Sequence, residues 1–317
     1  MKIIGTGRAH PAKVVTNAML EKFLDTSDEW IVERTGIKER KLISNERLED
    51  MAAKASLLAI EDAGLKPKDI DYIICSNVVN EYITPSLSCI VQGAIGAECA
   101  CVDINVACSG FVYALDMADD RINSGKAKNI LVLAAEEPTR MVDWSDRATC
   151  VLFGDGAGAV VVTEGDGYLG SRLEAKSMTD CLHYVRCLEP TPYITKEEFS
   201  APMYMNGRQV FKTAVMMSSR DINALLAEQG LQPKDVKYYV LHQANMRIIE
   251  AVAKQMDLDL SYFPHNVEYC GNTSSASVAL LLDELHRDGK LQRGDKLIVS
   301  AFGAGFTTGT CLIEWTK

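Results

Sequence analysis

One cysteine of this chain stands in a setting that suits a nucleophile. In the stretch Val102–Leu115 an apolar strand turns through small residues into a helix, and Cys108 lies where that helix should begin. Unpaired backbone N–H groups and the helix dipole favour a negative charge at such a point. We therefore expect a lowered pKa for the Cys108 thiol and a thiolate that can attack a carbonyl carbon. The other cysteines are expected to be buried structural thiols.

Two further polar residues suit the same chemistry. His242 comes directly after the apolar run Tyr238–Leu241, and Asn272 lies in a run of small polar residues, Gly271–Ser277. A helix cap would explain one or two residues of that run, because Asn, Thr and Ser cap helices well, but not all of them. A neutral amide donor beside a histidine suits a carbonyl oxygen that gains negative charge in a transition state. The sequence thus predicts a nucleophile with donors for the oxygen of its substrate.

The glycine-rich segments do not predict a nucleotide site. Gly5–Gly7 follows a strand, but Pro11 and the lack of a third glycine spoil a dinucleotide-binding pattern. Gly154–Gly158 is followed by an apolar strand rather than a helix, so it predicts a tight strand-to-strand turn. Phe302–Gly309 also follows a strand, and its small residues would let a backbone N–H approach a ligand and form part of an oxyanion hole.

An internal repeat indicates how these residues are positioned. Gly64–Ile74 matches Gly230–Val240 at an offset of 166 residues, and the same offset relates Cys108 to Ser274. Each matching segment follows an amphipathic helix and leads into a strand. We infer two similar α/β units, about 1–165 and 166–317, each a mixed sheet with helices on its faces. Equivalent strand ends and helix starts, where ligand sites form, would then converge on one central site.

Composition narrows the function classes. The formal net charge of −10 argues against general nucleic-acid binding, so an acidic partner would have to meet a local basic patch. There is no apolar run of about 18 residues that would predict a membrane span, and the first residues lack the apolar segment of a signal peptide. The ten cysteines are therefore expected to be reduced thiols of a cytoplasmic protein. Cys181, His183 and Cys187 lack a second ligand pair, so we expect no metal.

Taken together, the motifs resemble a known family. The chain is similar over its whole length to the β-ketoacyl-acyl-carrier-protein synthase III family of thiolase-superfamily condensing enzymes. The segments that carry the resemblance are Trp30–Ile37, Ala107–Gly110, Phe153–Gly158, His242–Asn245, Gly271–Ser274 and Gly303–Gly305. A thiolase would have a second cysteine where this chain has Gly303–Gly305, and an elongating synthase a second histidine where it has Asn272.

The resemblance implies a fold, a reaction and a partner. The fold would be thiolase-like, with two duplicated α/β halves packed as an αβαβα sandwich in a homodimer. Cys108 would take an acyl group from acyl-CoA, and His242 and Asn272 would assist decarboxylative Claisen condensation with malonyl-[acyl-carrier protein]. The product, a β-ketoacyl-[acyl-carrier protein], begins fatty-acid biosynthesis. No cofactor is needed.

The resemblance also assigns binding residues. The backbone N–H groups of Cys108 and Ala304 would form the oxyanion hole, and Trp30, Arg34 and Arg147 would bind CoA. Thr84 stands where some members carry a phenylalanine that narrows the acyl pocket, so this chain is expected to accept branched or longer starters. The residues expected to dock acyl carrier protein are Lys212, Gln243, Ala244, Asn245, Met246, Arg247 and Lys254.

The sequence leaves three alternative functions open. A related ketosynthase of secondary metabolism would share the triad and differ in its product. A Cys-His-Asn thioester hydrolase of the papain type would release free acid without consuming malonyl groups, although the duplicated halves argue against it. A non-catalytic binding protein that keeps the fold would not become acylated at Cys108.

Overall fold

Two sheets form the framework of the protein. The computed structural model describes residues 1–185 and 203–317, so Cys187 lies outside the described residues. The first sheet contains β1 (Lys2–Ala9), β4 (Tyr72–Ser76), β5 (Ala100–Ile104), β6 (Ile130–Glu136) and β7 (Gly156–Thr163). The second contains β8 (Tyr168–Ala175), β11 (Tyr238–Leu241), β12 (Lys296–Gly303) and β13 (Thr307–Glu314).

Both sheets are mixed, as the repeat predicted. The strand order of the first is β1-β7-β6-β4-β5, with β7 antiparallel to β1 and β6, and β4 parallel to β6 and β5. The second has the order β8-β13-β12-β11, with β13 antiparallel to β8 and β12, and β11 parallel to β12. Equivalent strands take equivalent places, except that β5 has no counterpart. All strands of the first sheet precede those of the second in the chain, while the division into two domains at 165/166 stays a prediction.

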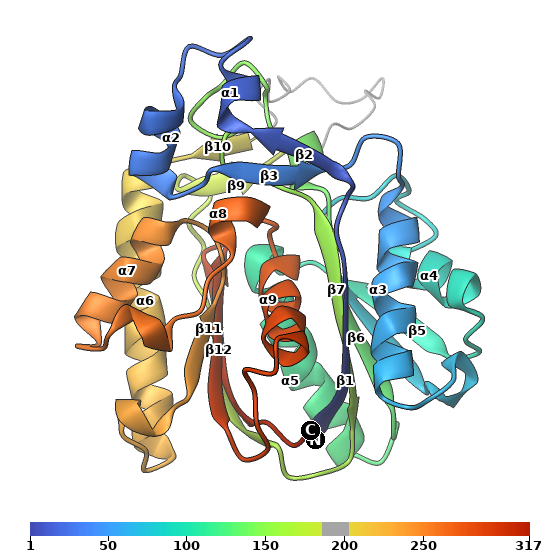
Figure 1. The fold of residues 1–317 in the computed structure, drawn as a ribbon. Coiled ribbons are helices and arrows are strands. Elements are labelled where there is room, and N and C mark those ends of the chain that lie inside the picture. The colour runs from blue at the N-terminus through green and yellow to red at the C-terminus, as the bar shows by residue number, and fades with distance from the viewer. Residues whose placement is uncertain (186–202) are drawn as a thin grey trace, which may run out of the picture.

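Helices cover both faces of each sheet. The longer ones are α3 (Leu48–Asp62), α4 (Leu87–Ile95), α5 (Gly110–Asn123), α6 (Gly207–Glu228), α7 (Met246–Gln255) and α9 (Ala276–Arg287). Figure 1 shows α3 and α4 outside the first sheet, α5 and α9 between the sheets, and α6 and α7 outside the second. The αβαβα order is therefore confirmed. Burial follows from it, because β6 has helices on both faces and is buried along its whole length.

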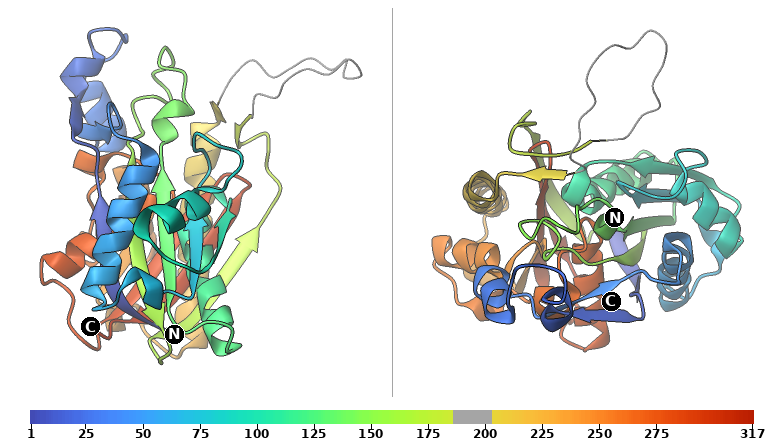
Figure 2. Two further views of the ribbon diagram at one scale, coloured as in Figure 1. Left: turned by 90° about the vertical axis from the view of Figure 1, so that its right-hand side faces the viewer. Right: turned by 90° about the horizontal axis from the view of Figure 1, so that it is seen from above.

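The central helices begin at one end of the sandwich, and short elements cover that end. They are α1 (Asn17–Leu20), α2 (Asp28–Thr35), α8 (Val267–Cys270), β2 (Lys13–Thr16), β3 (Glu39–Leu42), β9 (Leu182–Tyr184) and β10 (Met203–Met205). In Figures 1 and 2 most of them lie at the upper end, and both chain termini lie at the opposite end. Strands β4, β5, β6 and β11 run toward the covered end, so their carboxyl ends meet beneath it.

The repeat is confirmed in detail by two matching turns. One-turn 3-10 helices, η1 (Pro67–Asp69) and η4 (Pro233–Asp235), occupy equivalent places before β4 and β11. In each turn an aspartate carboxylate accepts a backbone N–H three residues earlier, at 2.8 Å from Lys66 and 2.7 Å from Gln232. The matching Gly-Leu-x-Pro-Lys-Asp sequences thus encode the same local structure twice.

The interpretation of Gly154–Gly158 as a strand-to-strand turn is wrong. A loop, not a strand, precedes it, and β7 already begins at Gly156. The glycines serve close packing instead, since a Cβ on Gly158 would lie 2.6 Å from the Cβ of Ala279 on α9. A Cβ on Gly154 would lie 2.1 Å from the carbonyl oxygen of Cys270. These glycines let the two halves approach each other.

Candidate active site

The structure brings the expected reactive residues together. Cys108, His242 and Asn272 all line one cavity of about 1410 Å³ beneath the covered end of the sandwich. Ala304 lines the same cavity, on the loop that connects β12 to β13. Residues far apart in the sequence thus share one chamber because equivalent ends of the two sheets face each other.

Cys108 stands on a strained turn before α5. It lies in the 3-10 helix η2 (Ala107–Ser109), which continues directly into α5, so the expected helix start is confirmed. Ala107 has a φ of 47°, a left-handed conformation that is unfavourable for a residue with a side chain. Gly303 packs against this turn so closely that a Cβ there would lie 2.6 Å from the Cys108 nitrogen. The turn therefore holds the thiol in one place in the cavity wall.

The expected lowering of the thiol pKa is wrong. Burial, together with a smaller effect of the Glu136 charge, raises the pKa of Cys108 to about 12, while the Ser274 hydroxyl works in the opposite direction. Desolvation disfavours a thiolate, and here it outweighs the start of the helix. The resting nucleophile is a thiol, and its proton must move when it attacks.

His242 is a buried, neutral imidazole. It is 2 % exposed, and burial lowers the pKa of His242 to about 3. Its Nδ1 lies 2.7 Å from the Ser277 hydroxyl, and its ring packs edge-on against Phe302 with centroids 5.3 Å apart. With Nδ1 held by a hydroxyl that can donate to it, Nε2 is left as the group that carries a proton toward the cavity.

Asn272 is fixed by backbone contacts between the two halves. Its N–H donates to the Leu152 carbonyl at 2.8 Å, and its own carbonyl accepts from the Gly154 N–H at 3.1 Å. Its side-chain Oδ1 accepts the Ser274 N–H at 2.9 Å. Because the side-chain oxygen is held, the amide nitrogen is the group that Asn272 offers to the cavity.

Two polar residues beside the nucleophile were not expected from the sequence. The Ser274 hydroxyl donates to the Cys108 sulfur at 3.5 Å and lies 3.3 Å from Oε1 of Glu136. The repeat did relate Cys108 to Ser274, and that relation was the available signal. Glu136 ends an apolar strand and resembles a solvated charge in the sequence, although it is fully buried.

The expected CoA residues form one cluster at the edge of the cavity. The guanidinium carbons of Arg34 and Arg147 lie 4.5 Å and 5.1 Å from the centre of the Trp30 ring. Arg34 also lines the cavity. Arg147 donates to the backbone carbonyl of Asp25 and lies 3.3 Å from its carboxylate. The three residues are therefore together, and their role toward CoA stays a prediction.

The expected carrier-protein surface is only partly a surface. Lys212 on α6 and Arg247 and Lys254 on α7 are exposed, and Arg247 also lines the cavity. Gln243 is a correction, because it is fully buried and its amide bonds the Leu241 carbonyl and the Asn266 N–H. It supports the His242 loop and cannot touch a docked protein.

The other residues of the same segment are partly or mostly buried. Ala244 is 8 % exposed and lines the cavity, so its contact with acyl carrier protein stays a prediction. Asn245 is half-buried and caps α7 by accepting the Arg247 N–H at 2.9 Å. Met246 is half-buried against Gly36, where a Cβ would lie 2.5 Å from the Met246 Cβ. The accessible charges of this region are therefore those of the lysines and the arginine.

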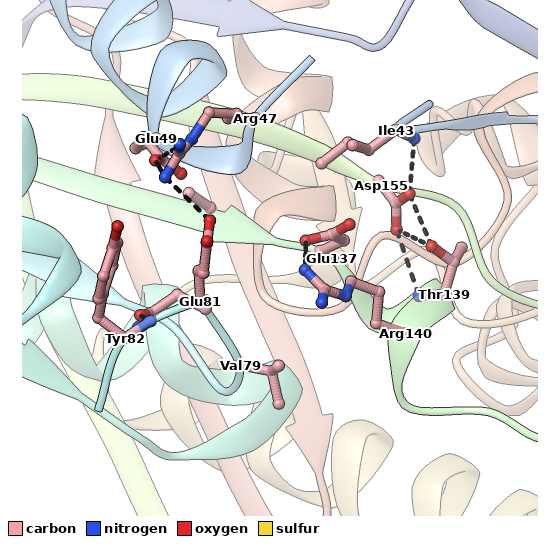
Figure 3. A network of polar contacts seen from close by, with 12 residues as sticks. Ile43, Arg47, Glu49, Val79, Glu81, Tyr82, Glu137, Thr139, Arg140 and Asp155 are labelled. Carbon is pink, nitrogen blue, oxygen red and sulfur yellow. Dashed lines mark hydrogen bonds and ion pairs between the residues drawn. The ribbon is translucent and has the colours of Figure 1, made fainter. Parts of the chain in front are cut away.

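Thr84 lies on an exposed loop that α3 helps to hold. Figure 3 shows Arg47, before α3, between Glu49 and Glu81, with 2.9 Å from its Nη2 to the Glu81 carboxylate. Tyr82 and Ile83 line the cavity, whereas Thr84 does not. The role expected for Thr84 belongs to a pocket shared across a dimer, and it stays a prediction.

No group of ligands for a metal ion occurs in residues 1–185 and 203–317. Cys181 is buried, and His183 lies with its Nδ1 2.6 Å from the Thr179 carbonyl, stacked on Tyr204. The helices in these two described parts of the chain include no candidate for a membrane-spanning segment.

Comparisons with known proteins place the chain in a family. Residues 102–180 match the family model 3-oxoacyl-[acyl-carrier-protein (ACP)] synthase III, and residues 226–315 match its C-terminal model. A β-ketoacyl-[acyl-carrier-protein] synthase III of Clostridium acetobutylicum is 45% identical, over 100% of this chain and 99% of the relative.

Solved structures agree with the sequence comparison. The 3-oxoacyl-[acyl-carrier-protein] synthase III of Aquifex aeolicus superposes with a TM-score of 0.93 at 42% identity, covering 99% of both chains. The priming β-ketosynthase of the R1128 polyketide pathway has a TM-score of 0.93 at 33% identity, covering 100% of this chain and 96% of that one. The thiolase-like fold implied by the motifs is therefore confirmed, and the chain belongs to the family of β-ketoacyl-[acyl-carrier-protein] synthases III.

Proposed function

We propose that this protein condenses an acyl-CoA starter with malonyl-[acyl-carrier protein] and so initiates fatty-acid biosynthesis. The observation that carries the proposal is the convergence of Cys108, His242 and Asn272 on the wall of one cavity. A thiol, a neutral imidazole and a fixed amide are what a thioester condensation needs, since one acts as nucleophile and two act as hydrogen-bond donors.

In the first half-reaction the Cys108 sulfur attacks the thioester carbon, and the carbon–sulfur bond to CoA breaks. The tetrahedral intermediate carries its negative charge on the former carbonyl oxygen. Backbone N–H groups of Cys108 and Ala304 are the proposed donors to this oxygen, because both residues line the cavity and Gly303, the neighbour of Ala304, packs against the Cys108 nitrogen. The acyl group then remains on the cysteine.

In the second half-reaction the malonyl thioester loses CO2. Its thioester oxygen accepts hydrogen bonds from Nε2 of His242 and the amide of Asn272, and the enolate forms beneath them. The neutral state of His242 suits this role, because a neutral N–H donor holds the oxygen without transferring its proton early. The enolate carbon attacks the acyl group, and Cys108 leaves as a thiolate.

Intact-protein mass spectrometry tests this proposal. Mixing the protein with a panel of acetyl-, branched and medium-chain acyl-CoA should add one acyl group to the wild type and none to Cys108→Ala. Adding malonyl-[acyl-carrier protein] should then remove the acyl mass and yield a β-ketoacyl product. Free acid formed without malonyl consumption would indicate a hydrolase, and no acylation at all would indicate a non-catalytic protein. The same panel tests the breadth of starters expected from Thr84.

A ketosynthase of secondary metabolism is the second candidate. The observation in its favour is the 33% identity to the priming β-ketosynthase of the R1128 polyketide pathway. Both candidates acylate the same cysteine, so only the product separates them. Assays with malonyl groups on fatty-acid and on polyketide carrier proteins should give the higher kcat/KM with the fatty-acid carrier protein.

We further propose that CoA binds at Trp30, Arg34 and Arg147 and that acyl carrier protein docks on the basic residues of α6 and α7. A half-buried aromatic ring with guanidinium groups suits an adenine and phosphates. On a chain of net charge −10, exposed Lys212, Arg247 and Lys254 give the local positive field that an acidic carrier needs. Arg247→Glu should raise the KM for malonyl-[acyl-carrier protein], whereas Lys68→Glu, at an exposed site before β4, should not.

We propose a homodimer formed along β5, in a cytoplasmic protein. Among the described strands β5 pairs only with β4, so its other edge is free to pair with a second copy. Helix α4 packs beside β5 and carries the exposed Cys89. Ile83, in the loop before α4, is exposed as well. Cys89→Arg should give monomers in mass photometry, whereas Met216→Arg, on the exposed face of α6, should leave the dimer intact.

A further inference from the structure

A carboxylate lies buried behind the nucleophile, and the proposed reaction does not yet use it. Glu136 ends β6 and has no exposed surface. Its Oε1 accepts the Ser275 hydroxyl at 2.6 Å, and its Oε2 accepts the Val78 N–H at 3.1 Å. No basic side chain is among these partners. A buried carboxyl without a cation is costly as an anion, so it is a natural place to hold a proton.

Ser274 connects this carboxyl to the thiol. Its hydroxyl lies 3.5 Å from the Cys108 sulfur and 3.3 Å from Oε1 of Glu136, so a single hydrogen can point to either side. Ser274 has a φ of 52°, an unusual conformation for a residue with a side chain. The bond from its N–H to Asn272 fixes that conformation. The hydroxyl is thereby held between sulfur and carboxylate rather than turned to the helix.

We propose that Glu136 is a positioning residue that stores the proton of Cys108, with the Ser274 hydroxyl as the bridge. This inference rests on the proposed function. The thiol proton passes to the Ser274 oxygen while the Ser274 proton passes to Oε1 of Glu136, and the sulfur lone pair attacks the thioester. CoA departs as a thiolate that takes its proton from solvent. After acylation the stored proton remains on Glu136.

The second half-reaction returns that proton. Loss of CO2 leaves a carbanion that bonds to the acyl carbon, and the carbon–sulfur bond to Cys108 breaks to give a thiolate. Glu136 then gives its proton to Ser274 as Ser274 gives its own to the sulfur. The thiol and the carboxylate are restored, and no oxidant, reductant or additional reactant is required.

The electrostatics of the pair agree with this geometry. Burial raises the pKa of Glu136 to about 7, while the hydroxyls of Ser275 and Ser274 and the Val78 N–H oppose the shift. The ionisable side chains that sense its charge are the thiols of Cys108 and of Cys75 on β4. One negative charge moves between carboxylate and sulfur, so the repulsion that raises the thiol pKa disappears when Glu136 takes the proton.

The pH dependence of Cys108 reactivity tests the proposal without a substrate. Iodoacetamide alkylation at Cys108 is followed by peptide mass spectrometry from pH 6 to 10, and acylation by acyl-CoA is followed in parallel. The wild-type rates should rise with a limb near pH 7 as Glu136 loses its proton. In Glu136→Gln and in Ser274→Ala this limb should vanish, and the rate at pH 7.5 should fall by about 10- to 100-fold.

Ser275→Ala is the matched variant. It removes the shorter hydrogen bond to Glu136 but no contact with the sulfur, so the limb should persist and move to higher pH. The double variant Glu136→Gln/Ser274→Ala should be no slower than either single variant, because both break one path. The proposal is overturned if the rates of Glu136→Gln still rise near pH 7 as in the wild type. It is also overturned if the rate losses of the two single variants add in the double variant. If acyl-CoA fails to react with the wild type while the alkylation limb is present, the proposed function fails and the proton store stands.

Discussion

The two halves of the molecule share a framework and differ where β5 lies. In the first half β5 follows α4 and completes a sheet of the order β1-β7-β6-β4-β5. At the equivalent place in the second half, 166 residues later, the chain forms the short helix α8 instead, and β11 remains an edge strand among the described strands. A duplicated framework thus supports two different local structures at the same position.

The difference assigns separate tasks to the halves. β5 leads through Asn105 into the strained turn at Cys108, so the first half presents the nucleophile. In the second half, Asn266 before α8 donates its N–H to Oε1 of Gln243 at 3.0 Å, beside His242. α8 then ends at Cys270 with Gly271 as its cap, directly before Asn272. The second half therefore presents the histidine and the amide, and its helix start carries a serine in place of the cysteine.

The largest effect is expected from exchanging the two equivalent residues. In the double variant Cys108→Ser/Ser274→Cys the same groups remain in contact, but the thiol moves to the other half. We expect the rate of condensation to fall by at least about 10³-fold, because the strained turn and the proposed oxyanion-hole N–H groups serve a nucleophile at position 108 and not at position 274. Intact mass after mixing with acyl-CoA measures acylation. Ser274→Cys alone should still be acylated at Cys108, and acylation at position 274 would show that the halves are interchangeable.

A smaller loss should separate the two half-reactions. Asn272→Ala removes one donor from the second half, and we expect condensation to fall by about 10²–10³-fold with malonyl-[acyl-carrier protein]. Acylation of Cys108 should fall by no more than about 10-fold, because its oxyanion donors belong to the turn and the β12–β13 loop and it loses only the hydrogen bond that holds Ser274 in place. Rapid-quench measurement of each half-reaction checks this. Equal losses in both would contradict the division of tasks between the halves.

The repeated framework could be predicted because each element carries its own local signal. The two Gly-Leu-x-Pro-Lys-Asp turns, the apolar strands and the small-residue turn at Cys108 all have counterparts in the structure. The start of α6 could not be placed correctly. It begins at Gly207, because Asn206 caps it by accepting the Gln209 N–H at 3.2 Å. That cap follows a short strand whose pairing with β9 is non-local.

The pKa values and the burial of the polar site residues could not be predicted from the sequence. A helix start predicts a stabilised thiolate, yet the pKa of Cys108 rises to about 12 because burial depends on what covers the cavity. Likewise Glu136 and Gln243 are polar residues whose burial is set by contacts from distant segments. Local patterns identify residue types at strand ends, whereas desolvation is a property of the assembled layers.

The outer helices show a second contrast between the halves. α3 meets β1 by direct backbone contact, since a Cβ on Gly7 would lie 2.3 Å from the Ala55 carbonyl oxygen and 2.5 Å from the Ala59 nitrogen. α6 meets β8 through side-chain ends, with Gln229 and Leu225 beside Gly170. Overpacking against a backbone cannot be relieved by rotating a side chain.

Gly7→Ala should therefore lower the free energy of unfolding by about 3 kcal/mol, as measured by denaturant titration. The matched control is Gly207→Ala at the start of α6, where a Cβ would meet nothing within 4 Å. It should change the free energy of unfolding by no more than about 0.5 kcal/mol. If Gly7→Ala lowers the free energy of unfolding as little as Gly207→Ala does, then α3 can move away from β1 at little cost.

The smallest effect concerns α8 itself, through a pair of ionisable residues at its start. Nδ1 of His265 lies 2.7 Å from the Glu268 carboxylate. The hydrogen bond to Glu268 raises the pKa of His265 above its usual value of 6.5. For Glu268 burial acts to raise the pKa, but the contact with His265 and the other hydrogen bonds prevail and lower it.

The directions of the two pKa shifts define the pH range in which the pair stabilises the protein. A raised histidine pKa contributes stability that is complete below 6.5 and is lost as the pH rises through the folded value. A lowered glutamate pKa contributes stability that is lost as the pH falls through its folded value, so the pair stabilises α8 most between the two. His265→Gln should reduce the free energy of unfolding by about 0.5 kcal/mol more at pH 6 than at pH 9. Glu268→Gln should give the same difference and the double variant no greater one, whereas a loss independent of pH would indicate packing rather than charge as the contribution of His265 to this helix.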